Sequence, residues 1–145
     1  MKKIHYQIEI NCSKEQVFAI MLDKEHYREW TAEFNPTSHY EGSWEEGNKI
    51  LFLGESKDGE KAGMHSLIEK LVPNNFISIK HLGMLEKGKE TSFEDDLYEN
   101  YYLENKGDST LLKVEMDTED DWIKSLDKTW PKALQKLKEV CENNC

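Results

Sequence analysis

Histidine, glutamate and tyrosine at alternate positions of two apolar segments are the residues of this chain best suited to hold a polar group or move a proton. In "FISIKHLG", residues 76–83, Ile79 and His81 fall on the same row at period two, so a histidine ends an apolar row. In "YENYYLEN", residues 98–105, one row carries Glu99 and Tyr101. If the two segments are neighbouring antiparallel strands, His81 lies near Glu99 across the pair, because side chains on one face come within about 4.5–5.5 Å there.

Three interpretations of His81 and Glu99 remain open from the sequence. An inward polar group needs a partner, because a buried donor or acceptor without one costs about 1–3 kcal/mol, so the pair could be purely structural. It could equally be the polar end of a ligand cavity, shared with Tyr101. A general acid and base of an enzyme is the third interpretation, and it requires both side chains to face open volume.

Other chemistry has weak support in the residue pattern. No two of the five histidines have the helical spacing of a zinc site, and neither a G-x-S-x-G motif nor a glycine-rich phosphate loop is present. The three cysteines, Cys12, Cys141 and Cys145, do not form the pattern of a disulfide framework, so we expect reduced thiols and a cytoplasmic location. We therefore assign no catalytic residue, no metal site and no cofactor.

Composition restricts the classes of partner. The chain has 145 residues and a net charge of −10, from 19 basic and 29 acidic residues, which argues against a nucleic-acid-binding protein. The longest apolar runs, "FAIML" and "ILFL", are too short to cross a membrane. No linker or repeat divides the chain, so we expect one domain over residues 1–145 that is a monomer or a weak dimer.

The elements that must position these side chains can be identified from periodicity. Residues 3–10 alternate as a half-buried strand, and two short helical segments follow, the first starting at a capping box of Ser13 and Gln16. Six more strand candidates lie between turn signals such as "EEGN", "KDGE" and "NKGD", which predicts an antiparallel sheet. The polar stretch 84–97 is predicted to be a surface loop.

The last segment predicts a long amphipathic helix over about residues 119–142. Apolar residues recur there at spacings of three and four from Trp122 to Cys141, and Thr118 is the expected N-cap. Pro131 removes a backbone donor, so we expect a kink or break near residues 127–130. The sequence thus predicts an α+β fold in which a seven-stranded antiparallel sheet wraps around this helix.

Several stretches carry a resemblance to a known family. They are "SKEQVFAIMLDKEHYREW", "GSWEEGNKILFL", "IEKLVPNNFISIKHLG", "YENYYLENKGDSTLLKVEMD" and "WPKALQKLKEV". Together with the order of elements, they resemble the START-like or SRPBCC superfamily, the helix-grip fold of the birch pollen allergen, in its branch related to the activator of heat-shock-protein-90 ATPase. The resemblance implies a cavity between the long helix and the sheet. Cyclases of this superfamily place acid–base residues in that cavity, and no cyclase motif is found here.

The function expected from this combination is the binding of an unidentified apolar or amphipathic small molecule in the cavity. We expect the cavity to be lined by His81, Glu99, Tyr101, Ile79, Phe52, Trp30, Trp122 and Met116. One alternative is a cyclase or hydratase-like enzyme that uses His81 and Glu99. The other is a chaperone-cofactor role, which predicts an exposed apolar patch on the outside of the sheet at Leu51, Leu53, Leu67 and Leu111.

Overall fold

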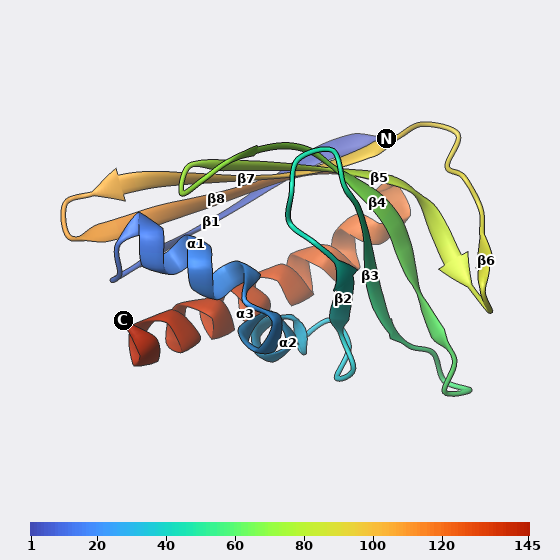
Figure 1. Cartoon of the computed structure of the whole chain (residues 1–145), viewed down its shortest axis with the longest axis horizontal. Coiled ribbons are helices and arrows are strands. Elements are labelled where there is room, and N and C mark those ends of the chain that lie inside the picture. The colour runs from blue at the N-terminus through green and yellow to red at the C-terminus, as the bar shows by residue number, and fades with distance from the viewer.

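The computed structural model describes residues 1–145, and its elements follow the predicted order. One strand comes first, two short helices follow, strands fill the middle of the chain, and a long helix ends it (Figure 1). The elements are β1 (Lys2–Ile10), α1 (Lys14–Leu22), α2 (Lys24–Thr31), β2 (His39–Gly42), β3 (Lys49–Glu55), β4 (Lys61–Val72), β5 (Phe76–Glu86), β6 (Lys89–Glu90), β7 (Leu97–Lys106), β8 (Ser109–Thr118) and α3 (Asp120–Asn144).

All strands belong to one antiparallel sheet with the order β1-β8-β7-β5-β4-β3-β2, and the two-residue strand β6 pairs with β5. The first strand lies beside the last because β1 pairs with β8 from Lys2–Thr118 to Ile10–Thr110. The seven longer strands are those that the sequence predicts. The three helices lie on one side of the sheet, and α3 runs along that side (Figure 1). The predicted α+β fold, a sheet wrapped around a long helix, is confirmed.

Local signals set the limits of the two short helices. The hydroxyl of Ser13 accepts the Gln16 backbone N–H at 3.2 Å, while the Gln16 side chain accepts the Ser13 N–H at 3.4 Å, so the predicted capping box is present. Asp23 ends α1 and caps α2 by accepting the His26 N–H at 3.2 Å. Gly107, with a φ of +67°, provides the left-handed conformation that the tight β7–β8 turn requires.

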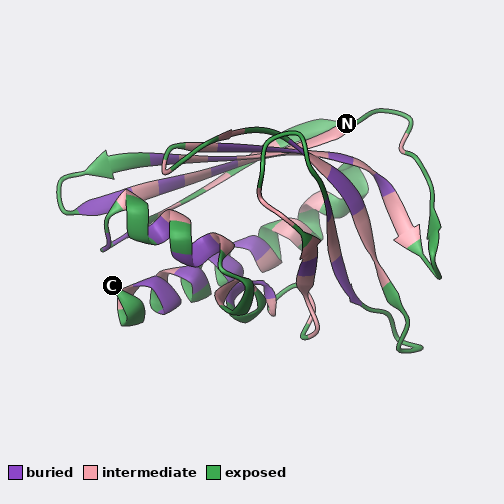
Figure 2. Ribbon diagram, in the orientation of Figure 1, coloured by how far each residue is buried: buried purple, intermediate pink, exposed green.

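A cluster of 21 buried hydrophobic residues joins the sheet to the three helices. Figure 2 shows the buried residues gathered on the strands and on parts of the helices, while the hairpin tips are exposed. Leu134 and Leu137 of α3 lie in this core and are almost fully buried. Burying a leucine side chain contributes about 1.5–3 kcal/mol, so the inward stripe of α3 is a main source of stability.

Of the kink or break expected in the last helix, the structure excludes the break. α3 is uninterrupted from Asp120 to Asn144 with Pro131 inside it. The residue before the proline, Trp130, is 3% exposed and packs its ring 5.9 Å from that of Tyr6 and 5.0 Å from that of Phe34. This packing offsets the loss of one backbone hydrogen bond, since most helical stability in proteins comes from tertiary contacts.

The predicted N-cap of α3 was also wrong. Thr118 is the last residue of β8, where it pairs with Lys2 of β1. Because this pairing keeps Thr118 extended, the N-cap position passes to Glu119, whose side chain makes no capping hydrogen bond. A favourable capping residue was outweighed here by the sheet ladder.

The prediction of one surface loop over residues 84–97 fails for its first half. β5 continues to Glu86, turns at Lys87 and Gly88, and returns as β6. Both turn residues have positive φ, 50° and 76°, as a two-residue turn of type I′ requires, and "KG" is a weaker signal for such a turn than "NG". Residues 91–96 have no regular secondary structure.

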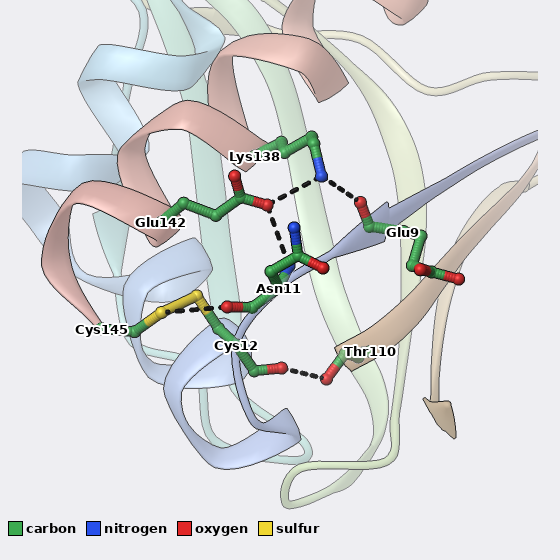
Figure 3. Close-up of polar contacts among 7 residues, drawn as sticks. All are labelled: Glu9, Asn11, Cys12, Thr110, Lys138, Glu142 and Cys145. Carbon is green, nitrogen blue, oxygen red and sulfur yellow. Dashed lines mark hydrogen bonds and ion pairs between the residues drawn. A yellow bond between two sulfur atoms is a disulfide. The ribbon is translucent and has the colours of Figure 1, made fainter. Parts of the chain in front are cut away.

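The expectation of three reduced thiols is wrong for two of them. Cys12 and Cys145 form a disulfide with a Cα–Cα distance of 6.0 Å, across a sequence separation of 133 residues (Figure 3). The bond ties the end of α3 to the link between β1 and α1. Spacing along the chain could not reveal it, because only the packing of α3 against β1 and α1 brings the two positions together.

Two further contacts hold the same end of α3 (Figure 3). Lys138 donates to the backbone carbonyl of Glu9 at 2.8 Å, and Glu142 accepts the backbone N–H of Asn11 at 2.9 Å.

Cys141 is free and fully buried, and this burial raises the pKa of its thiol to about 12. The cytoplasmic location was inferred from reduced thiols, so it loses that support, because disulfides are rare in the cytosol. None of the helices is long and apolar enough to cross a membrane.

Candidate functional site

A pocket of about 250 Å³ lies between α2, the first half of α3 and the inner face of the sheet. Strands β3, β4, β5, β7 and β8 contribute to its wall, and 11 of its 17 lining residues are hydrophobic. The lining consists of Tyr27, Trp30, Thr31, Phe34, Ser38, Phe52, Leu53, Gly54, Ala62, Gly63, Met64, His81, Glu99, Tyr101, Met116, Leu126 and Trp130.

Three polar side chains of the pocket, His81, Glu99 and Tyr101, form one connected cluster. His81 on β5 has its Nε2 3.0 Å from Oε1 of Glu99 on β7. The other ring nitrogen, Nδ1, lies 2.7 Å from the hydroxyl of Ser66 on β4. Tyr101 donates its hydroxyl to Oε2 of Glu99. Three neighbouring strands thus bring these groups together, and every polar atom of the imidazole and the carboxylate has a partner.

The electrostatics of this cluster favour an ionised glutamate. Burial alone would raise the pKa of Glu99, but the hydrogen bond and the charge of His81, with the hydrogen bond from Tyr101, bring that pKa below its ordinary value. The pKa of Tyr101 is raised well above its ordinary value by burial and by the neighbouring Glu99. Burial and the charge of Glu99 raise the pKa of Tyr27 in the same way.

Aromatic rings surround the rest of the pocket. We call the rings of Tyr27, Trp30, Phe52, Tyr101 and Trp130 the aromatic wall. Successive centroids around it are 6.2 Å apart for Phe52 and Tyr27, 5.6 Å for Tyr27 and Trp30, and 6.3 Å for both Trp30–Trp130 and Trp130–Tyr101. The Phe52 ring also lies 5.7 Å from that of His81. The wall and the polar cluster therefore form one closed ring around the pocket.

Six of the eight residues predicted to line the cavity do so in the structure. They are His81, Glu99, Tyr101, Phe52, Trp30 and Met116. Ile79 is only 1% exposed and belongs to the core beside the pocket rather than to its lining. Trp122 is 62% exposed and lies outside the pocket. Trp122 belongs to the first turn of α3, where the indole is left uncovered. Helical spacing shows which face of a helix is apolar, but not whether another element covers that face.

Sequence reasoning missed Ser66, the second partner of His81. The inward row of β4 could not be assigned because β4 and β5 change register between His65 and Ser66 and again between Ile68 and Lys70. Such bulges break the alternation on which the assignment of strand faces depends. Phe34 was also missed, since it follows α2 in a turn and has no strand or helix pattern around it.

Ser66, His81 and Glu99 have the order of a serine–histidine–acid relay, but the geometry does not support a nucleophile. Ser66 is fully buried, and it does not line the pocket. A substrate in the pocket could not reach it, and a nucleophile must contact the atom that it attacks. The role that the arrangement does support is to hold the imidazole and the carboxylate in fixed orientations.

His65 has a structural environment. It is 6% exposed, and its Nε2 lies 2.7 Å from the backbone oxygen of Thr91 beside β5. Gly83 leaves space for this contact, because a Cβ there would come within 2.6 Å of the imidazole.

No group of three or more histidine, cysteine, aspartate or glutamate side chains is arranged to hold a metal ion.

The apolar patch expected for a chaperone contact is not exposed. Leu53 is 5% exposed, and Leu51, Leu67 and Leu111 are half-buried. The large hydrophobic residues that are exposed, Met1, Phe34, Val72 and Trp122, are spread over different elements.

Comparisons with known proteins agree with this architecture. No curated protein matches the sequence. Protein NE0264 from Nitrosomonas europaea matches with a TM-score of 0.78 and 11% identity, over 99% of this chain and 96% of that one. The Aha1 dimer from Colwellia psychrerythraea matches with a TM-score of 0.72 and 20% identity, over 98% and 97% of the two chains. CalU16 from Micromonospora echinospora matches with a TM-score of 0.69 and 18% identity, over 96% and 75%.

These identities are low, so the solved structures establish a shared fold and not a shared ligand. They support the helix-grip fold that the sequence predicts. The family model described as "Activator of Hsp90 ATPase homolog 1-like protein" matches residues 11–142, and the chain belongs to that family.

Proposed function

We propose that the chain binds a small amphipathic organic molecule in the pocket between α2, α3 and the sheet. The observation that carries this proposal is the combination of a largely apolar lining with one converging polar cluster, His81, Glu99 and Tyr101. Ligand sites in proteins typically combine an apolar surface with a few placed polar groups that fix orientation. The aromatic wall provides the first and the polar cluster provides the second.

The size of the pocket limits the ligand. A dry engineered cavity of about 150 Å³ can hold benzene, which has six non-hydrogen atoms. By the same ratio the 250 Å³ pocket accommodates roughly ten non-hydrogen atoms. A ligand with one short apolar body and one polar head fits this limit, whereas a long lipid chain does not.

The alternatives have less support. A chaperone contact is suggested by the name of the family, and a dimer by one solved relative, but of the leucines expected to form an exposed patch one is buried and three are half-buried. An acid–base enzyme would use His81 and Glu99, which both line the pocket, but their ring nitrogens and carboxylate oxygens are already hydrogen-bonded to each other, to Ser66 and to Tyr101. Binding needs nothing beyond the pocket itself.

Native mass spectrometry of the purified protein would test the proposal by detecting a co-purifying molecule of about ten non-hydrogen atoms. A second test measures the binding of 3-phenylpropan-1-ol, a molecule of that size, by ligand-observed NMR. We expect Met116→Trp, which adds a large ring to the pocket lining, to abolish binding, and Trp122→Ala, a change outside the pocket, to leave it unchanged. Binding that survives Met116→Trp would contradict the proposal, and so would a wild-type protein that carries no co-purifying molecule and binds neither this alcohol nor its ammonium and carboxylate analogues.

A further inference from the structure

The pocket lining contains an acidic side chain but no lysine or arginine to balance its charge. Glu99 is the only carboxylate among the 17 lining residues, which include no lysine and no arginine. Glu99 is ionised near neutral pH, because the hydrogen bonds from His81 and Tyr101 lower the pKa of its carboxyl group even without a charge on the imidazole, and the raised pKa values of Tyr27 and Tyr101 keep both phenols neutral. The charge of the pocket therefore depends on Glu99 and on the protonation of His81.

The contacts of His81 are satisfied by a neutral imidazole. The hydroxyl of Ser66 can donate to Nδ1, and the Nε2–H can then donate to Glu99, so no second proton is needed on the ring. In this arrangement the lining carries one net negative charge. Each oxygen of Glu99 accepts one hydrogen bond, from His81 or Tyr101, and keeps a further lone pair for another donor.

The surroundings of Glu99 also suit a positive charge. The face of an aromatic ring attracts a cation within about 6 Å, and indole rings do so most strongly. Trp30 and Trp130 stand in the aromatic wall with Tyr101, whose hydroxyl contacts Glu99. The overall charge of −10 would further favour the approach of a cation over that of an anion.

We infer that the ligand of this pocket is a small organic cation, with an ammonium head beside Glu99 and an apolar body against the aromatic wall. This inference rests on the proposed function and narrows it to one class of ligand. The head is a primary, secondary or quaternary ammonium group, since a carboxylate bordered by aromatic rings attracts all three. Hydrogen bonding to the carboxylate favours the first two, and the ring faces serve all three.

A series with one body and three heads tests the inference. The probes are 3-phenylpropylammonium, 3-phenylpropan-1-ol and 3-phenylpropanoate, each of about ten non-hydrogen atoms, which matches the scaling of cavity volume used above. Their dissociation constants are measured by calorimetry with wild type, Glu99→Gln and Tyr101→Phe. Glu99→Gln keeps the shape of the side chain and removes its charge. Tyr101→Phe removes a hydroxyl but keeps the carboxylate and the ring.

We expect the ammonium probe to bind wild type about tenfold more tightly than the alcohol, because its positive charge adds an attraction to the hydrogen bond that either head can make to Glu99. The preference should disappear in Glu99→Gln and persist in Tyr101→Phe. The carboxylate probe should bind most weakly.

Each contrary result has a distinct meaning. Equal binding of ammonium and alcohol by wild type would overturn the cation inference and leave the proposed function intact. Tighter binding of the carboxylate would also overturn it, by indicating a protonated His81. Failure of all three probes would overturn both proposals. Because the wild-type series alone decides these outcomes, the test remains valid even if Glu99→Gln does not fold.

Discussion

His81 contacts Glu99 diagonally across the sheet rather than directly. In the β5–β7 pair, His81 faces Leu97 and Glu99 faces Ile79, yet the His81 Nε2 and Glu99 Oε1 atoms are 3.0 Å apart. Diagonal neighbours in an antiparallel pair are within reach of long side chains only. The contact therefore depends on the length of the glutamate and on the orientation that Tyr101 gives to its second oxygen.

The lowered pKa of Glu99 predicts a specific dependence of stability on pH. Its ionised form is favoured in the folded state, so the stabilisation is fully present above the unfolded pKa of about 4.3 and is lost as pH falls through the folded value. We expect wild type to lose more stability than Glu99→Gln between about pH 5 and pH 3. Urea denaturation at several pH values measures this, and parallel curves for the two proteins would show that the carboxylate is not stabilised by folding.

The inward stripe of α3 predicts a large cost for shortening a buried leucine. Leu137 is 0% exposed in the core, so Leu137→Ala should lower the free energy of unfolding by about 2–5 kcal/mol. Lys136 is exposed on the same turn, and Lys136→Ala should change it by less than about 0.5 kcal/mol. Chemical denaturation of both variants measures the difference, and equal midpoints would refute the assigned helix face.

The disulfide between Cys12 and Cys145 predicts a response to reducing agents. The closed loop is long, so losing the bond should cost about 2–4 kcal/mol by restoring freedom to the unfolded chain. We expect dithiothreitol to lower the urea midpoint of wild type to that of Cys145→Ser, while the variant itself does not respond. A wild-type midpoint that does not change on reduction would show that the bond does not contribute to stability.

Residues 91–96 predict a sharp local pattern of amide exchange. The amides of Thr91 and Phe93 donate to carbonyls of Met84 and Leu82 at 2.9 Å, whereas no backbone hydrogen bond holds residues 94–96. Residues 94–96 should therefore exchange faster than Thr91 and Phe93, which in turn should resemble the end of β5. Uniform exchange across 91–96, measured by NMR, would contradict the observed pairing.

Much of the fold was predictable because its elements carry strong periodic patterns. The alternation in most of the longer strands and the stripe of α3 reflect burial of one face, and a periodic sequence records that directly. The contact of His81 with Glu99 was predictable for the same reason, since both lie on inward rows of neighbouring strands. The capping box at Ser13 was predictable for another reason, since it is a hydrogen-bond motif within one short segment.

Departures from the prediction arise where a contact depends on another element. The contact of Ser66 with His81 could not be predicted, because register shifts in β4 break the simple alternation of inward and outward side chains. The hairpin of β5 and β6 carries a weak turn signal and is polar, so it has no burial pattern. Pro131 stays helical because Trp130 is packed, and Trp122 is exposed because its turn is not covered.

The sequence by itself determined the inward rows of most elements, the order of the elements and the most promising polar pair. Only the tertiary structure decided that Cys12 meets Cys145, that Ser66 supports His81, and that the aromatic rings line one pocket with Glu99. The physical reason is that periodicity records burial, which each residue experiences within its own element. A disulfide, a hydrogen-bond relay or a ring of aromatic side chains depends on distances between elements far apart in the chain, and folding alone sets those distances.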